Sequence, residues 1–175
     1  MTQEPRWAVF ALGGNLDDPL ATLRVAVGRL AAVLEAPRVS AVYRTRPEGG
    51  ADQPCYLNAT VAGATLLSPR EVLGLAQALE ADAGRVRPYP GAPRSLDVDV
   101  VFLGDTVVDE PGLRIPHPRW AGRDFVVIPL LDIVPDFLDP ESGRTVRDVA
   151  AAAGWLGMTL PRELEPGDLL ALEAS

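Results

Sequence analysis

Arginines and carboxylates gather in one short stretch of the chain, GRVRPYPGAPRSLDVD. Arg85, Arg87 and Arg94 lie on a loop rich in proline and glycine, with no acidic residue between them. Asp97 and Asp99 follow on a segment whose alternating apolar residues are typical of a strand. Because side chains two positions apart on a strand project to the same face, we expect both carboxylates to point together.

The chemistry of this stretch favours a site for a metal and a polyphosphate. Two carboxylates on one face repel each other, and a divalent cation is the usual compensation. Mg²⁺ prefers oxygen ligands of this kind and keeps coordination positions for water and phosphate oxygens. Guanidinium groups bind phosphate oxygens through paired hydrogen bonds. We therefore expect a nucleoside triphosphate site, with a solvated strand face beside surface arginines as the alternative.

The overall composition limits which side chains can do this chemistry. All 16 basic residues are arginines, which excludes a Schiff-base lysine and a P-loop. The net charge of −8 argues against general electrostatic binding to nucleic acid or to a membrane surface. The single cysteine, Cys55, excludes an internal disulfide and a Cys/His zinc cluster, and it fits a reducing compartment.

The length of 175 residues fits one domain over 1–175. The sequence shows neither a basic-then-apolar leader nor an apolar run long enough to cross a membrane. We expect a cytoplasmic protein that is a monomer or weak homo-oligomer. Its partners are expected to be small-molecule substrates, with no nucleic acid and no membrane.

Hydrophobic periodicity and turn residues divide the chain into strands and helices. The helix that begins at Pro69 has the clearest start, because Ser68 and Glu71 form a capping box. The expected strands are 7–12, 38–45, 56–66 and 95–103, the last continued by a hairpin turn at Gly104-Asp105 into 106–109. The expected helices are 19–34, ended by Pro37, then 69–83, stopped by Gly84, and 123–134 and 146–156, while the acidic end, 161–175, is expected to fray. This order predicts an α+β, ferredoxin-like βαββαβ core with an antiparallel sheet, an extra hairpin and C-terminal helices.

Other motifs admit two interpretations each. The turn at 13–15, GGN, suits either a phosphate at a helix N-terminus or a tight structural turn. Tyr56 and Asn58 share a strand face, where they suit a flat heterocycle or ordinary packing. Glu80 fits a surface ion pair as well as a site, and His117, between two prolines, fits a structural group as well as a ligand-binding one. On the strand 95–103 the apolar residues expected to face a core are Leu96, Val98, Val100 and Phe102.

Taken in order, these motifs resemble the 6-hydroxymethyl-7,8-dihydropterin pyrophosphokinase family of folate biosynthesis. The similar pieces run from ALGGNL through YRT, DQPCYLN, GRVR and APRSLDVDVV to IPHPR and RDFVVIPLLDI. The resemblance implies transfer of pyrophosphate from ATP to the hydroxymethyl group of the pterin, with release of AMP.

The same resemblance implies roles for individual residues. Two Mg²⁺ ions would be held by Asp97 and Asp99, and the catalytic residues would be Arg85, Arg94, Asp97 and Asp99. The ATP site would be formed by Gln77, Glu80, Arg85, Arg87, Arg94, Val100, His117 and Arg123. The pterin ring would lie between Tyr56 and Phe125, in a pocket completed by Thr45 and Asn58.

The implied mechanism is an in-line attack of the pterin hydroxyl on the β-phosphorus of ATP, while metals and arginines take up charge. A loose transition state asks little of a general base, and Asp97 or a metal-bound water is a candidate proton acceptor. Loops 46–54 and 84–94 are expected to close over the substrates. Pro90 and Gly91 stand where some family members carry a basic residue and a tryptophan, which implies a stiffer loop with fewer cations.

Two alternatives belong to other functional classes. A metal-dependent nucleotidyl- or phosphotransferase with another acceptor would keep the carboxylates and arginines but not need the ring-binding residues. A ferredoxin-like RNA-binding module would need a basic sheet face with exposed aromatic residues. The acidic composition, with 6% aromatic residues, disfavours the second alternative.

Overall fold

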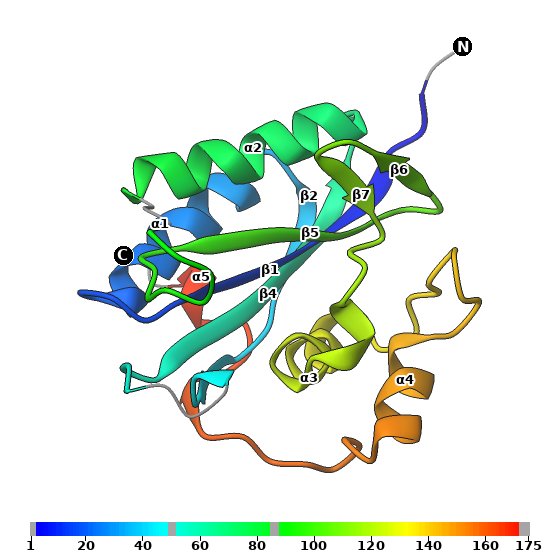
Figure 1. Ribbon diagram of the computed structural model, residues 1–175. Helices are drawn as coiled ribbons and strands as arrows, with labels where there is room; N and C mark the ends of the chain where they lie inside the picture. Colours follow the sequence, from blue (N-terminus) through cyan, green and yellow to red (C-terminus); the bar gives the residue numbers. More distant parts are fainter. Residues whose placement is uncertain (1–2, 49–51, 85–87, 172–175) are drawn as a thin grey trace.

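An antiparallel sheet forms the centre of the fold, with strands in the order β5-β1-β4-β3-β8 and β2 paired to β4. A computed structural model describes residues 3–48, 52–84 and 88–171 (Figure 1). The strands of this sheet are β1 (Arg6–Gly14), β2 (Glu35–Val39), β3 (Val42–Thr45), β4 (Tyr56–Thr65), β5 (Asp97–Leu103) and β8 (Arg162–Leu164). With α1 (Pro19–Ala31) after β1 and α2 (Pro69–Asp82) after β4, the predicted ferredoxin-like βαββαβ core is confirmed.

Helices cover both faces of the sheet (Figure 1). α1 and α2 bury Leu23, Leu30 and Val72 on one face, where they pack with Phe10 of β1. On the other face lie α3 (Asp124–Ile133) and α4 (Val146–Ala153), which form a second apolar cluster around Trp120, Leu130 and Val146. The short 3₁₀ turn η2 (Trp120–Gly122) leads into α3. The carboxylate-bearing face of β5 is the face that α3 covers.

Local sequence signals set the helix starts as expected. Ser68 Oγ accepts from the Glu71 N–H at 3.3 Å, and the Glu71 carboxylate accepts from the Ser68 N–H at 2.8 Å, which confirms the capping box. α1 ends at Ala31, before the predicted residue 34, and Glu35 already pairs with Ala64 of β4. Pro37 therefore lies inside β2 rather than stopping a helix, at the irregularity in the register between Glu35 and Arg38.

The predicted strand 38–45 is two strands that share β4 as a neighbour. Ser40 breaks the run, since its hydroxyl accepts from the Thr60 N–H at 2.8 Å. The next N–H, of Ala41, donates to the Asp132 carboxylate of α3 at 3.0 Å. This donor therefore leaves the sheet ladder, and pairing resumes only at β3.

The prediction for the end of β5 was wrong in two respects. A register shift opposite Val9 and Phe10 turns Phe102 away from Val98 and Val100, so that it stacks on Phe137 with ring centroids 4.6 Å apart. The hairpin after β5 also differs, because residues 106–109 do not pair with β5. It is instead β6 (Val108–Glu110) that pairs with β7 (Leu113–Ile115).

The expectation of a frayed acidic end was wrong for the part that the structure describes. β8 pairs with β3, and Leu169 of α5 (Asp168–Ala171) is fully buried against the α1 layer. One buried leucine and one strand pairing tie this segment to the fold despite its charge. Among the described residues, no helix is long and apolar enough to cross a membrane.

Candidate active site

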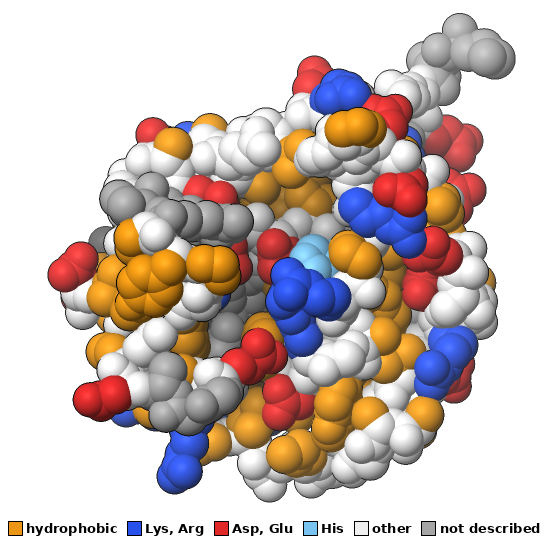
Figure 2. All heavy atoms as spheres, in the orientation of Figure 1, with side chains coloured by type: hydrophobic (Ala, Val, Ile, Leu, Met, Phe, Trp, Pro, Cys, Tyr) orange, Lys and Arg blue, Asp and Glu red, His pale blue; other side chains and the backbone are white. Residues whose placement is uncertain are grey.

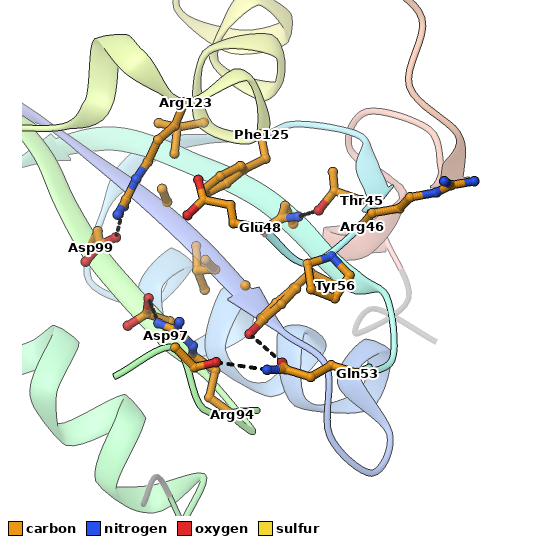
Figure 3. Close-up of a pocket in the computed structure, with 17 residues that line it drawn as sticks. Thr45, Arg46, Glu48, Gln53, Tyr56, Arg94, Asp97, Asp99, Arg123 and Phe125 are labelled. Atoms are coloured by element: carbon orange, nitrogen blue, oxygen red, sulfur yellow. Dashed lines mark hydrogen bonds and ion pairs between the residues drawn. The ribbon is translucent and has the colours of Figure 1, made fainter. Parts of the chain in front are cut away.

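A cavity opens where the ends of β1, β4 and β5 meet the start of α3. Figure 2 shows it as a hollow with acidic and basic side chains at its rim, and Figure 3 shows its lining. The predicted site residues that line it are Thr45, Tyr56, Asn58, Arg94, Asp97, Asp99, Arg123 and Phe125. Residues implied for the pterin and residues implied for the phosphates and metals thus share one cavity.

Asp97 and Asp99 occupy the same face of β5, as predicted from their spacing. Opposite them on β1 stand Gly13, which has no side chain, and Ala11, which has only a methyl group, so the carboxylates stay open to the cavity. Each carboxylate faces a guanidinium from the described part of the chain. Arg94 Nη1 lies 2.8 Å from Asp97 Oδ2, and Arg123 Nη1 lies 3.7 Å from Asp99 Oδ2.

Arg94 is charged and partly buried, and it lies between the Asp97 carboxylate and the Tyr56 ring. Burial disfavours its charge, but the Asp97 carboxylate and Tyr56 outweigh burial and raise the pKa of Arg94 above its ordinary value. Its guanidinium carbon lies 5.8 Å from the centre of the Tyr56 ring. A phosphate group near this position would meet a permanent cation.

His117 lies beside the carboxylate pair and is held by its backbone, whose N–H donates to Val101 O at 3.0 Å. Burial, followed by the charges of Arg123 and Arg119, lowers the pKa of His117 from 6.5 to about 4. Its Nδ1 accepts from the Arg119 N–H at 3.1 Å, so the proton of the neutral ring is on Nε2. Nε2 lies 3.8 Å from Asp99 Oδ1, so the imidazole presents an N–H donor beside the carboxylates.

The other half of the cavity carries the side chains that the family resemblance implies for binding the pterin ring. Tyr56 begins β4 and stands opposite Thr45 of β3, while Asn58 donates from Nδ2 to Thr45 Oγ1 at 2.6 Å. Phe125, in the first turn of α3, also points into the cavity (Figure 3). Two aromatic rings with amide and hydroxyl groups between them match the needs of a flat, polar heterocycle.

The phosphate-binding interpretation of residues 13–15 is wrong, and the chain turns later than predicted, because Gly13 and Gly14 are the last residues of β1. A Cβ atom on Gly14 would lie 2.3 Å from Ser95 O, so the backbone before β5 packs directly on the end of β1. The Asn15 N–H, which a phosphate would need, already donates to Arg94 O at 3.0 Å. No space is left for an anion at this position.

Four of the described residues implied for the ATP site do not line the cavity, namely His117, which lies beside Asp99, and Gln77, Glu80 and Val100. Glu80 Oε1 accepts from the Val98 N–H at 2.8 Å. Val98 lies between Asp97 and Asp99 in the sequence, so Glu80 packs against β5 at that point. Gln77 is exposed on α2, and Val100 is buried in the core beneath α1 and α2. Their assignments to ATP stay predictions, and Arg85 and Arg87 lie outside the described residues.

Several lining residues were not predicted. Glu48 and Gln53 come from the loop before β4, and Gly91 comes from the loop before β5. Gln53 belongs to the stretch DQPCYLN that carried the family resemblance, which was the available signal. Its place in the cavity wall depends on its hydrogen bond to Gly91, which is 38 positions away and is not visible in the local sequence.

The donor set fits Mg²⁺ in the manner expected for a nucleotide site. Among the described residues, no group of three or more His, Cys, Asp and Glu side chains forms a metal cluster. Asp97 and Asp99 could hold a metal as a pair of carboxylates, with water and phosphate oxygens as its remaining ligands. The two carboxylates already attract cations, since Asp97 pairs with Arg94 and Asp99 lies near Arg123.

Comparison with known proteins shows the family of this chain. A family model described as 7,8-dihydro-6-hydroxymethylpterin-pyrophosphokinase (HPPK) matches residues 9–135. The 2-amino-4-hydroxy-6-hydroxymethyldihydropteridine pyrophosphokinase of Synechocystis sp. is 39% identical over 97% of this chain and 91% of its own length. The proteins of the same name from Methylorubrum extorquens and Pseudomonas aeruginosa are 40% and 37% identical, over 82% and 85% of this chain and 91% and 92% of their own lengths.

Among solved structures, Plasmodium falciparum HPPK-DHPS matches with a TM-score of 0.68 at 14% identity. The match covers 87% of this chain and 45% of that longer chain, and it supports the fold alone. The fold, the site and the relatives together define an enzyme of the transferase class, a pyrophosphokinase. The chain belongs to the 6-hydroxymethyl-7,8-dihydropterin pyrophosphokinase family.

Proposed function

We propose that this enzyme transfers pyrophosphate from ATP to the hydroxymethyl group of 6-hydroxymethyl-7,8-dihydropterin, releasing AMP. The observation that carries this proposal is the single cavity in which a ring-binding half adjoins a carboxylate and arginine half. An acceptor ring and a polyphosphate bound in these halves would place a hydroxyl beside a phosphorus atom. We also propose that the reaction takes place in the cytoplasm, as a step of folate biosynthesis.

The ring-binding half accounts for the pterin. Tyr56 and Phe125 offer aromatic faces for the bicyclic ring, and the amide of Asn58 offers a donor and an acceptor to its edge. Asn58 is only 6% exposed, and its Nδ2 already donates to Thr45 Oγ1, so its orientation is fixed before the ligand arrives. A fixed amide selects a ring with matching hydrogen-bond groups, because a mismatched ring would leave the amide unpaired.

The other half accounts for the triphosphate. Arg94 and Arg123 supply permanent positive charge, and neutral His117 supplies an N–H donor. Asp97 and Asp99 would hold two Mg²⁺ ions, which would neutralise charge on the phosphate oxygens. Among the described residues, two arginines touch both halves. Arg94 contacts Asp97 and lies over Tyr56, while Arg123 lies near Asp99 and over Phe125.

In the proposed reaction the pterin hydroxyl oxygen bonds to the β-phosphorus of ATP in line with the bond that breaks. AMP leaves with the electron pair of the α,β-bridging bond, and the hydroxyl proton leaves to solvent or to a nearby carboxylate such as that of Asp97. Arg94 and Arg123 would stabilise the charge that spreads over the transferring oxygens. The walls of the cavity would exclude water, so that hydrolysis does not compete with transfer.

The test is an assay with ATP, Mg²⁺ and 6-hydroxymethyl-7,8-dihydropterin, in which AMP and the pterin diphosphate are measured. We expect AMP and the pterin diphosphate in equal amounts. As a matched control, the 6-methyl dihydropterin keeps the ring but has no hydroxyl, so it should bind without consuming ATP. Release of ADP, or equal AMP formation with the control pterin, would contradict the proposed function.

A further inference from the structure

Asn15 connects the two loops that frame the cavity. It follows the end of β1, and only 3% of its surface is exposed. Its Nδ2 donates to Pro54 O at 3.0 Å and to Gln53 Oε1 at 3.2 Å. Its Oδ1 accepts from the Arg94 N–H at 3.0 Å, and its own N–H donates to Arg94 O at 3.0 Å. One buried amide thus joins the strand end, the loop before β4 and the loop before β5.

Gln53 extends this connection across the cavity. Its Nε2 donates to Gly91 O at 2.9 Å, and its Oε1 accepts from the Tyr56 hydroxyl at 3.4 Å (Figure 3). The chain from Tyr56 through Gln53 and Asn15 to the backbone of Arg94 is therefore continuous. It links a ring-binding side chain to a phosphate-side cation without passing through a substrate.

The base of this connection is rigid. Gly13 and Gly14 pair with Asn58 and Leu57 in the sheet, so the residue that follows them starts from a fixed backbone. The Arg94–Ser95 backbone is pressed against Gly14, where a Cβ atom would lie 2.3 Å from Ser95 O. Movement of either loop relative to the sheet must break hydrogen bonds of Asn15.

Only an amide satisfies all of these partners. The site needs two donors, toward Pro54 and Gln53, and an acceptor toward the Arg94 N–H. An aspartate would set an oxygen against the Pro54 carbonyl, and a serine would not reach both loops. A buried amide with each of its groups paired has a single orientation and fixes its neighbours.

We propose that Asn15 is a positioning residue for the pyrophosphoryl transfer. It fixes the backbone of Arg94 relative to Tyr56, so that the two substrates meet in one geometry. The proposal rests on the function proposed above, but it concerns alignment rather than contact, since Asn15 does not line the cavity. A displacement of about 1 Å at a reacting centre is enough to slow a reaction about 100-fold.

The test compares Asn15→Ala with Ser68→Ala, which removes the N-cap of α2 away from the cavity and so destabilises the fold without touching the site. We expect Asn15→Ala to lower kcat about 100-fold when rates are expressed per folded molecule. The dissociation constants of ATP and of the pterin, each titrated alone, should change less than about tenfold. Ser68→Ala should keep wild-type kcat although its melting temperature falls.

A second variant guards against loss of folding. Gln53 is partly exposed, so Gln53→Ala should fold, and it should lower kcat about tenfold because it removes the bonds to Asn15 and Gly91. Turnover within threefold of Ser68→Ala for both variants would overturn the proposal and assign Asn15 a purely structural role. A wild-type enzyme that forms no AMP from these substrates would instead overturn the proposed function.

Discussion

His117 should remain neutral across the physiological pH range, and this can be measured directly. Burial and the charges of Arg123 and Arg119 lower the pKa of His117 from 6.5 to about 4, against a smaller opposing effect of Asp97. The imidazole side chain is only 16% exposed, so solvent screens these interactions weakly. The chain has one histidine, so its ¹H NMR spectrum contains a single imidazole Hε1 signal. In metal-free protein we expect this signal not to shift between about pH 8 and pH 5.5.

The same shift predicts how stability depends on pH. Between about pH 6.5 and pH 4 the unfolded chain binds a proton at His117 that the folded protein does not. The contribution of His117 to the free energy of unfolding is therefore highest above about pH 6.5, and it is lost as the pH falls toward 4. For a pKa of about 4 in the folded state, the loss between pH 8 and pH 5 amounts to about 2 kcal/mol. Urea unfolding at the two pH values measures it.

The matched control is His117→Gln, which has no titrating group but keeps an amide donor. Its unfolding free energy should change less over the same pH range, by the contribution of His117, since the carboxylates titrate alike in both proteins. An Hε1 signal that titrates near pH 6.5, or equal pH dependence in the two proteins, would refute the reasoning. His117 would then approach the phosphates as a cation rather than as a neutral N–H donor.

The remaining predictions concern the two halves of the cavity. Asp97→Asn and Asp99→Asn should each lower kcat about 100-fold or more, because each removes an anionic ligand proposed for Mg²⁺; wild-type rates over a Mg²⁺ titration would contradict the metal assignment. Arg94→Ala should lower kcat about 100-fold while weakening pterin binding much less, and the reverse pattern in kinetics and calorimetry would place Arg94 in the ring-binding half. Tyr56→Ala should raise the pterin dissociation constant roughly tenfold or more through loss of stacking, as calorimetry would show, with ATP binding little changed as the internal control.

The features that could be predicted from sequence are those set by neighbours in the chain. The spacing of Asp97 and Asp99 placed both on one face of β5, because alternation along a strand needs no other information. The capping box of Ser68 and Glu71 fixed the start of α2 in the same way. Their spacing singled out Tyr56 and Asn58, while Thr45 and Phe125 came from the family resemblance. The structure brings all four residues to one cavity.

The errors lie where distant segments decide the local conformation. The strand expected over 38–45 is divided because Asp132, from α3, takes the N–H of Ala41. Phe102 faces the α3 layer because the register on β1 shifts opposite it. No pattern in the strand itself records either partner, so local periodicity gives the wrong face and the wrong length.

The sequence by itself determined the chemistry available to this enzyme: paired carboxylates, arginine as the only permanently charged side-chain cation, one histidine and the order of elements that carries them. The tertiary structure decided how these groups work together. It made His117 neutral by burying it beside Arg123, and it made Asn15 a link between loops rather than a phosphate cradle. The physical reason is that charge state and hydrogen-bond pairing depend on which groups share a low-dielectric space, and that is set by contacts across the whole fold.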